Sequence, residues 1–146
     1  MSQQNGCAPN FPLLSPYLVV RDAAKALDFY ARAFGFTQRE VMKGPDGGIK
    51  HAEMSYGEAV IMFAPEMGCE GTQAKAPATT GAESPVSLCV YCPDVDALFA
   101  RATSAGARAL KAPEDQFWGD RLCQVLDPNG HSWCFLTHKG QCAAKA

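Results

Sequence analysis

Two short segments of this 146-residue chain hold the side chains best suited to chemistry. In HAEMSY, His51 and Glu53 are two residues apart, so on an extended strand they share one face and form a polar-ligand or acid–base pair. In QFWGDR, the aromatic pair Phe117 and Trp118 precedes the cation Arg121. An aromatic wall beside a cation suits a flat or anionic ligand. We therefore predict ligand-binding roles for His51, Glu53, Trp118 and Arg121.

Each candidate also has a purely structural interpretation. His51 and Glu53 are equally compatible with an exposed or structurally bonded polar pair. Trp118 can instead cap the core, and Arg121 can pair with a nearby carboxylate, either Asp115 or Asp120.

Strand alternation adds three candidates that share mixed, partly apolar faces: Tyr17, Met62 and Cys134. Counting from a two-residue turn at Tyr56-Gly57 places His51 opposite Met62. Counting from the Asp127–Gly130 turn makes Cys123 and Cys134 cross-strand neighbours, with Arg121 pointing inward. A tyrosine hydroxyl or a thiol on such a face can contact a ligand or simply fill space.

These residues must be positioned by a duplicated chain. Matching residues recur 71 to 73 positions apart: Asp22 with Asp94, Gly35 with Gly106, and Gly57 with Gly130. Each half reads as strand, helix and three strands, with the aspartates as helix N-caps and the first two glycines as helix stops. The predicted boundaries are a first module over 12–66, a linker or loop over 67–83, a second module over 84–138, and tails at 1–11 and 139–146.

The predicted fold class is therefore α+β. Each predicted helix has one apolar stripe, with Tyr30 and Phe34 in the first helix and Leu98 and Ala102 in the second. Each stripe must pack against one apolar face of a sheet. The mixed strand faces then line a concavity, which is the composition expected of a small-molecule site.

Composition excludes several function classes. The net charge is −2 without a basic stripe, which argues against nucleic acid and anionic membranes. No apolar run is long enough to span a membrane, and the N-terminus does not resemble a signal peptide. Seven cysteines, an odd number at irregular spacings, indicate reduced thiols and a cytoplasmic location. The Cys89–Cys92 CxxC alone is weak evidence for zinc.

The segments VRDAAKALDFYARAFGF, QFWGDR and DPNGHSW make residues 12–138 resemble the vicinal oxygen chelate superfamily of glyoxalase I, bleomycin-resistance proteins and extradiol dioxygenases, most closely the PhnB-like branch. The resemblance implies paired βαβββ modules with U-shaped sheets around a cleft, and a homodimer. Metal-dependent members carry ligands on the first and last strand of each module. The family usually has His or Glu there, whereas the corresponding residues here are Ser15, Met62, Pro85 and Cys134. Because this chain departs from the family pattern, we expect no metal and no cofactor.

The leading hypothesis is binding of a small organic molecule in the cleft, in the manner of bleomycin-resistance proteins. One alternative is a lyase, isomerase or dioxygenase that uses His51 and Glu53 with a displaced metal. Another is a thiol-based sensor that uses Cys123, Cys134 or the CxxC.

Overall fold

The computed structural model of the protein describes residues 6–67 and 73–140. The chain divides into two compact units, Met1–Ala31 with Gly35–Lys75, and Arg32–Phe34 with Ala76–Ala146. No helix in the described ranges is both long and apolar enough to cross a membrane.

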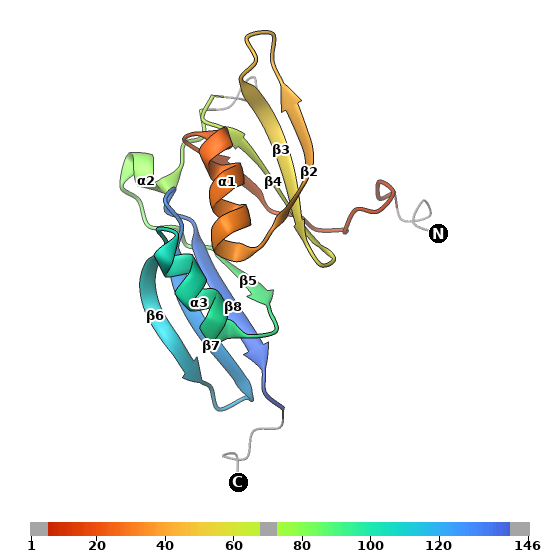
Figure 1. Ribbon diagram of the computed structural model, residues 1–146. Coiled ribbons are helices and arrows are strands. Elements are labelled where there is room, and N and C mark those ends of the chain that lie inside the picture. Colours follow the sequence, from red (N-terminus) through yellow and green to blue (C-terminus); the bar gives the residue numbers. More distant parts are fainter. Residues whose placement is uncertain (1–5, 68–72, 141–146) are drawn as a thin grey trace. The chain divides into compact units, whose positions relative to one another are not determined.

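The first unit contains strand, helix and three strands in the predicted order (Figure 1). Its elements are β1 (Tyr17–Val20), α1 (Ala23–Phe34), β2 (Thr37–Lys43), β3 (Ile49–Tyr56) and β4 (Ala59–Pro65). The sheet order is β1-β4-β3-β2, with β1 parallel to β4 and the other pairs antiparallel. The Asp22 carboxylate accepts the Lys25 amide at 3.0 Å and begins α1, and Gly35, with φ 81°, ends it.

The second unit repeats this plan (Figure 1). Its elements are α2 (Pro77–Thr80), β5 (Ser87–Tyr91), α3 (Val95–Ser104), β6 (Arg108–Asp115), β7 (Asp120–Leu126) and β8 (Ser132–His138). The sheet order β5-β8-β7-β6 matches the first sheet strand for strand. Asp94 caps α3 by accepting the Ala97 amide at 3.1 Å. The predicted α+β fold with two βαβββ modules is confirmed.

One face of each sheet packs against a helix and holds the core. In the first sheet, Ala52, Met54, Ile61 and Phe63 are at most 3% exposed, and Tyr30 of α1 meets Phe63 edge-on with ring centroids 5.5 Å apart. In the second sheet, α3 covers β6, β7 and β8. The buried residues on its covered face are Cys123, Val125, Trp133 and Phe135. We call the opposite side of each sheet its open face.

The two hairpins differ from the predicted registers in different ways. In the first, the loop is Gly57-Glu58 and Tyr56 pairs with Ala59, so Glu53 rather than His51 lies opposite Met62. This shift of two residues leaves every side chain on its predicted face, because side chains alternate with a period of two.

In the second hairpin, five residues separate the paired Leu126 and Ser132. This moves β7 by one residue relative to β8. Cys123 therefore pairs with Phe135 and faces the helix, and the predicted pairing of Cys123 with Cys134 is wrong. The Asp127 carboxylate explains the longer loop, because it accepts the Asn129 and His131 amides and the indole N–H of Trp133.

A short helix lies in the predicted linker. The Ala78 amide in α2 donates to the Asn129 carbonyl at 2.9 Å, which ties this segment to the β7–β8 loop. Gly130 at that contact has φ 88°, and a Cβ there would lie 2.8 Å from the Ala78 nitrogen, so the close approach requires glycine.

Candidate functional site

The open face of the first sheet carries a chain of hydrogen-bonded polar side chains. The Tyr17 hydroxyl on β1 lies 2.9 Å from Nδ1 of His51 on β3, and Nε2 of His51 lies 3.1 Å from the Glu53 carboxylate. Because a carboxylate only accepts, Nε2 of His51 donates to Glu53, while Nδ1 pairs with the tyrosine hydroxyl. The side chains of His51 and Glu53 are 18% and 16% exposed. Both ring nitrogens of His51 are therefore held by protein partners in a half-buried position.

Further groups extend this chain at both ends. Met62 is the register neighbour of both Tyr17 and Glu53, and supplies an apolar surface between them. The Arg39 guanidinium lies 3.8 Å from the Glu53 carboxylate and stacks over the ring of Phe11. Arg39 and Phe11 also line a hollow of about 620 Å³ on this unit. The structure thus brings together three predicted residues, Tyr17, His51 and Glu53, and places Met62 beside them.

The open face of the second sheet is mainly apolar. Leu122, Cys134 and Leu136 are 6 to 8% exposed and form one buried cluster. Cys134, predicted for the mixed face, does lie on this side. Burial first, and then the neighbouring thiol of Cys89, raise the pKa of Cys134 to about 12.

A buried carboxylate organises the edge of this second face. Asp120, 4% exposed, accepts hydrogen bonds from the Tyr91 hydroxyl, the Trp118 indole and Nδ1 of His138, each at 2.8 Å. The His138 and Tyr91 hydrogen bonds lower the pKa of Asp120, although its burial opposes them. Trp118 is thereby fixed with its ring 47% exposed, in edge contact with Phe117. Sequence reasoning took Asp120 only as a partner for Arg121 and missed this role.

Arg121 points toward the helix rather than toward the open face. Its guanidinium bonds both carboxylate oxygens of Asp96, in the first turn of α3, and the carboxylate of Asp115. These partners raise the pKa of Arg121 above its ordinary value. The predicted inward orientation of Arg121 is wrong, because the one-residue shift of β7 exchanges its faces.

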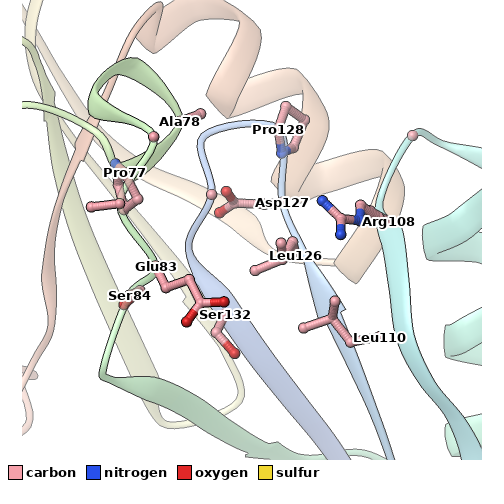
Figure 2. A pocket seen from close by; sticks show the side chains of 14 residues that line it. Pro77, Ala78, Glu83, Ser84, Arg108, Leu110, Leu126, Asp127, Pro128 and Ser132 are labelled. Atoms are coloured by element: carbon pink, nitrogen blue, oxygen red, sulfur yellow. The ribbon is translucent and has the colours of Figure 1, made fainter.

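A separate pocket of about 540 Å³ lies at the β7–β8 loop of the second unit. Figure 2 shows Arg108 and Leu110 on one side of it, Glu83 and Ser84 on the other, and Leu126 between them. Its volume is in the range of small-molecule sites. No sequence pattern singled out these residues, because β6 and the segment before β5 carry no chemical motif.

The residues present do not fit the divalent metal that the suggested superfamily implies. The parallel registers pair Met62 with Tyr17 and Cys134 with Cys89, so Ser15 and Pro85, which precede β1 and β5, are not the first-strand neighbours. Among residues 6–67 and 73–140, no group of three or more His, Cys, Asp or Glu side chains is placed to hold an ion. Both ring nitrogens of His51 already have protein partners.

Comparison with known proteins identifies the family. The profile of the Glyoxalase/Bleomycin resistance protein/Dioxygenase superfamily matches residues 12–135. The uncharacterized protein Mb0911c of Mycobacterium bovis is 44% identical over 125 residues, which are 84% of this chain and 80% of that protein. The crystal structure of TioX from Micromonospora sp. ML1 has a TM-score of 0.67 at 28% identity, over 86% of this chain and 97% of that chain.

TnmS3, an antibiotic-binding protein from Streptomyces sp. CB03234, has a TM-score of 0.63 over 90% of this chain and 99% of that chain, and at 20% identity it shows the shared fold alone. The two matching βαβββ modules and the profile match over most of the chain lead to one conclusion. The chain belongs to the Glyoxalase/Bleomycin resistance protein/Dioxygenase superfamily.

Proposed function

We propose that the protein binds a small organic molecule on the open face of its first sheet, without the superfamily's metal. The observation that carries this proposal is the hydrogen-bonded chain Tyr17–His51–Glu53. His51 holds the Tyr17 hydroxyl and the Glu53 carboxylate in fixed positions, and the oxygens of these two groups can accept further hydrogen bonds from a polar group on a ligand. Met62 supplies apolar contact area next to these polar groups, and the hollow beside Arg39 has a mixed lining that includes the apolar Phe11 and Val60.

The second sheet carries a separate candidate surface for a flat ligand. Trp118, held by Asp120, and Phe117 present exposed rings, and Cys134 lies on an apolar floor. Arg121 contributes least, because its guanidinium is bound to two carboxylates. The fold shared with TnmS3 favours antibiotic-like compounds as a first ligand panel. Assignment to the PhnB-like branch remains a proposal.

Calorimetric titration of the purified protein with such a panel tests the proposal. A hydrogen bond to a charged group contributes about 1.5–3 kcal/mol, and His51→Ala releases the Tyr17 and Glu53 oxygens that would make it, so this substitution is expected to weaken binding about 10- to 100-fold. Arg108→Ala, which changes the pocket of Figure 2 instead, is the matched control and should leave affinity unchanged. If Arg108→Ala abolishes binding and His51→Ala does not, the ligand uses the other pocket and the proposal is wrong.

The rival function is a metal-assisted reaction of the same superfamily at His51 and Glu53. The 3.1 Å contact between these two side chains favours it, but an ion would have to displace a partner of the imidazole. Elemental analysis of untagged protein, with and without added divalent metals, separates the two functions. A stoichiometric metal that disappears in His51→Ala would establish the rival.

We also propose a homodimer in the reducing cytoplasm. Membership of the superfamily supports the dimer, and the free thiols of Cys89, Cys92, Cys123 and Cys134 in the second module support a reducing compartment. Native mass spectrometry reports the dimer, any retained metal and any bound ligand together. A monomer at micromolar concentration would contradict the first part.

A further inference from the structure

The pocket of about 540 Å³ in the second unit has no role in the proposed function. It is bounded by α2 and the segment that follows it, by the first residues of β6, and by the loop between β7 and β8 (Figure 2). All of its lining residues belong to the second unit. The Tyr17–His51–Glu53 chain and the aromatic rings of Phe117 and Trp118 lie outside this lining. The pocket is therefore a site in its own right.

Hydrogen bonds hold the walls of this pocket in place. The Ala78 amide donates to the Asn129 carbonyl at 2.9 Å, which joins α2 to the β7–β8 loop. The carboxylate of Asp127 is already bonded to two amides of that loop and to the Trp133 indole, so it holds the loop rather than a ligand. A pocket whose walls are formed in advance costs a ligand little ordering of the protein.

Two opposite charges enter the pocket from opposite walls. Figure 2 shows the Arg108 guanidinium and the Glu83 carboxylate both directed toward the space around Leu126. Within residues 6–67 and 73–140, neither group takes part in an ion pair or a side-chain hydrogen bond. The guanidinium groups of Arg39 and Arg121, in contrast, bind carboxylates. Both charges in the pocket are therefore available to a ligand.

The surface between the two charges is apolar. Leu126 lies between the walls, and Leu110, which is 47% exposed, stands beside Arg108 (Figure 2). A ligand that covers these leucines removes apolar surface from water, which favours binding. The remaining apolar residues of the lining are Pro77, Ala78, Ala82 and Pro128.

This arrangement selects the class of ligand. The planar guanidinium of Arg108 matches a carboxylate with two parallel hydrogen bonds. Glu83 attracts an ammonium group and repels a second negative charge, so it excludes polyanions. Because the two side chains lie on opposite walls, the charges of the ligand must be separated by a spacer, and Leu126 favours an apolar one.

We propose that this pocket binds a small zwitterion whose carboxylate and ammonium groups are separated by an apolar chain. The carboxylate binds Arg108, the ammonium group binds Glu83, and the chain covers Leu126. No bond forms or breaks. The site shares no residue with the Tyr17–His51–Glu53 chain, so it does not depend on the proposed function.

NMR titration of the full-length protein with ε-aminocaproate tests this site. Caproate and hexylamine are the matched probes, because each has the same chain and only one of the two charges. The zwitterion should bind about fivefold more tightly than either, the upper range for an exposed ion pair. The amide signals of Leu126 and Ser132 should shift on binding, since both residues line the pocket. The homologues γ-aminobutyrate and ω-aminocaprylate cover shorter and longer spans between the walls.

Two substitutions assign the charges. Arg108→Ala should weaken binding of ε-aminocaproate and caproate about fivefold and leave hexylamine unchanged. Glu83→Gln should weaken ε-aminocaproate and hexylamine and leave caproate unchanged. The matched control is Lys111→Ala, which removes a positive charge from the same strand but outside the pocket lining, and should change none of these affinities. Arg108 and Glu83 are exposed, so both variants should fold, as circular dichroism will check.

Three results would overturn this proposal. The first is that none of the three zwitterions binds the wild type. The second is that caproate binds as tightly as ε-aminocaproate, which would make the pocket a site for anions alone. The third is that folded Arg108→Ala and Glu83→Gln both retain full affinity for the zwitterion. Each of these results leaves the proposed function standing, because that function is tested with other ligands and at His51.

Discussion

The two modules share a backbone plan but carry different chemistry at matching positions. In the first sheet, Met62 lies between Tyr17 and Glu53. In the second, Cys134 lies between Cys89 and Gln124.

The helix-facing positions, in contrast, remain apolar in both modules, with Phe63 in one and Phe135 in the other, each fully buried. Core packing therefore constrains one face of each sheet. The open faces have diverged into a polar chain in one module and a thiol-bearing apolar floor in the other. Variation on the open faces can thus change function without loss of the fold.

The largest expected effects test the contrast between the two sides of each sheet. Phe63→Ala and Phe135→Ala should each lower the free energy of unfolding by about 3–5 kcal/mol, because each removes a fully buried aromatic ring. The controls are Met62→Ala and Cys134→Ala on the open faces, measured by the same denaturant titrations. If Met62→Ala costs as much as Phe63→Ala, the open face of the first sheet is part of the core and the comparison fails.

Intermediate effects are expected at the matching hairpin glycines. Gly57 and Gly130 both have positive φ, so alanine costs about 1–2 kcal/mol at either from the left-handed backbone alone. An added Cβ meets nothing within 4 Å at Gly57, but at Gly130 it would meet the Ala78 amide nitrogen at 2.8 Å.

Gly130→Ala should therefore lower the free energy of unfolding more than Gly57→Ala does. The expected extra loss is about 1 kcal/mol, because the added Cβ would disrupt the hydrogen bond that ties α2 to the β7–β8 loop. Thermal and denaturant unfolding of both variants measure the difference. Equal losses would mean that α2 is not held by this contact.

The smallest effect concerns the pH dependence of the buried carboxylate in the second module. The pKa of Asp120 is lowered in the folded protein, chiefly by the His138 and Tyr91 hydrogen bonds. The unfolded state therefore takes up the proton first, and the stability that Asp120 contributes is complete above its unfolded pKa, about 3.9. This contribution is lost as the pH falls from there through the folded pKa.

The stability difference between the wild type and Asp120→Asn should thus shrink as the pH falls below about 4. Tyr91→Phe removes one hydrogen-bond donor, so it should move the folded pKa of Asp120 up toward its ordinary value. The pH range over which the Asp120 contribution is lost should then become narrower. Denaturant titrations across the acid range measure all three proteins. If the stability difference between the wild type and Asp120→Asn grows as the pH falls, the pKa of Asp120 is raised rather than lowered in the folded protein, and the prediction is wrong.

Much of the fold was predictable because its signals are local. The caps Asp22 and Asp94 and the stop at Gly35 act within one helical turn, and the alternating burial along β1 and β5 follows from the alternation of strand side chains. The His51–Glu53 pair was predictable for the same reason, since an i, i+2 spacing on a strand fixes a shared face.

The candidate site was less predictable wherever it depends on loop length. The first hairpin was displaced by two residues, which exchanges no faces, so Tyr17, His51 and Glu53 stayed together as predicted. The second was displaced by one residue, which put Arg121 and Cys123 on the helix side. The Asp127 side chain sets that loop through three hydrogen bonds, which turn rules for two-residue hairpins do not include.

The amino-acid sequence by itself determined the duplicated plan, the helix boundaries and the apolar faces of the first sheet, because capping and alternation depend only on near neighbours along the chain. Tertiary structure decided which side chains meet across strands: Tyr17 with His51, and Asp120 with Tyr91, Trp118 and His138. The physical reason is that these contacts join residues far apart in the sequence. A change of one residue in a loop then reassigns every partner on the strand that follows.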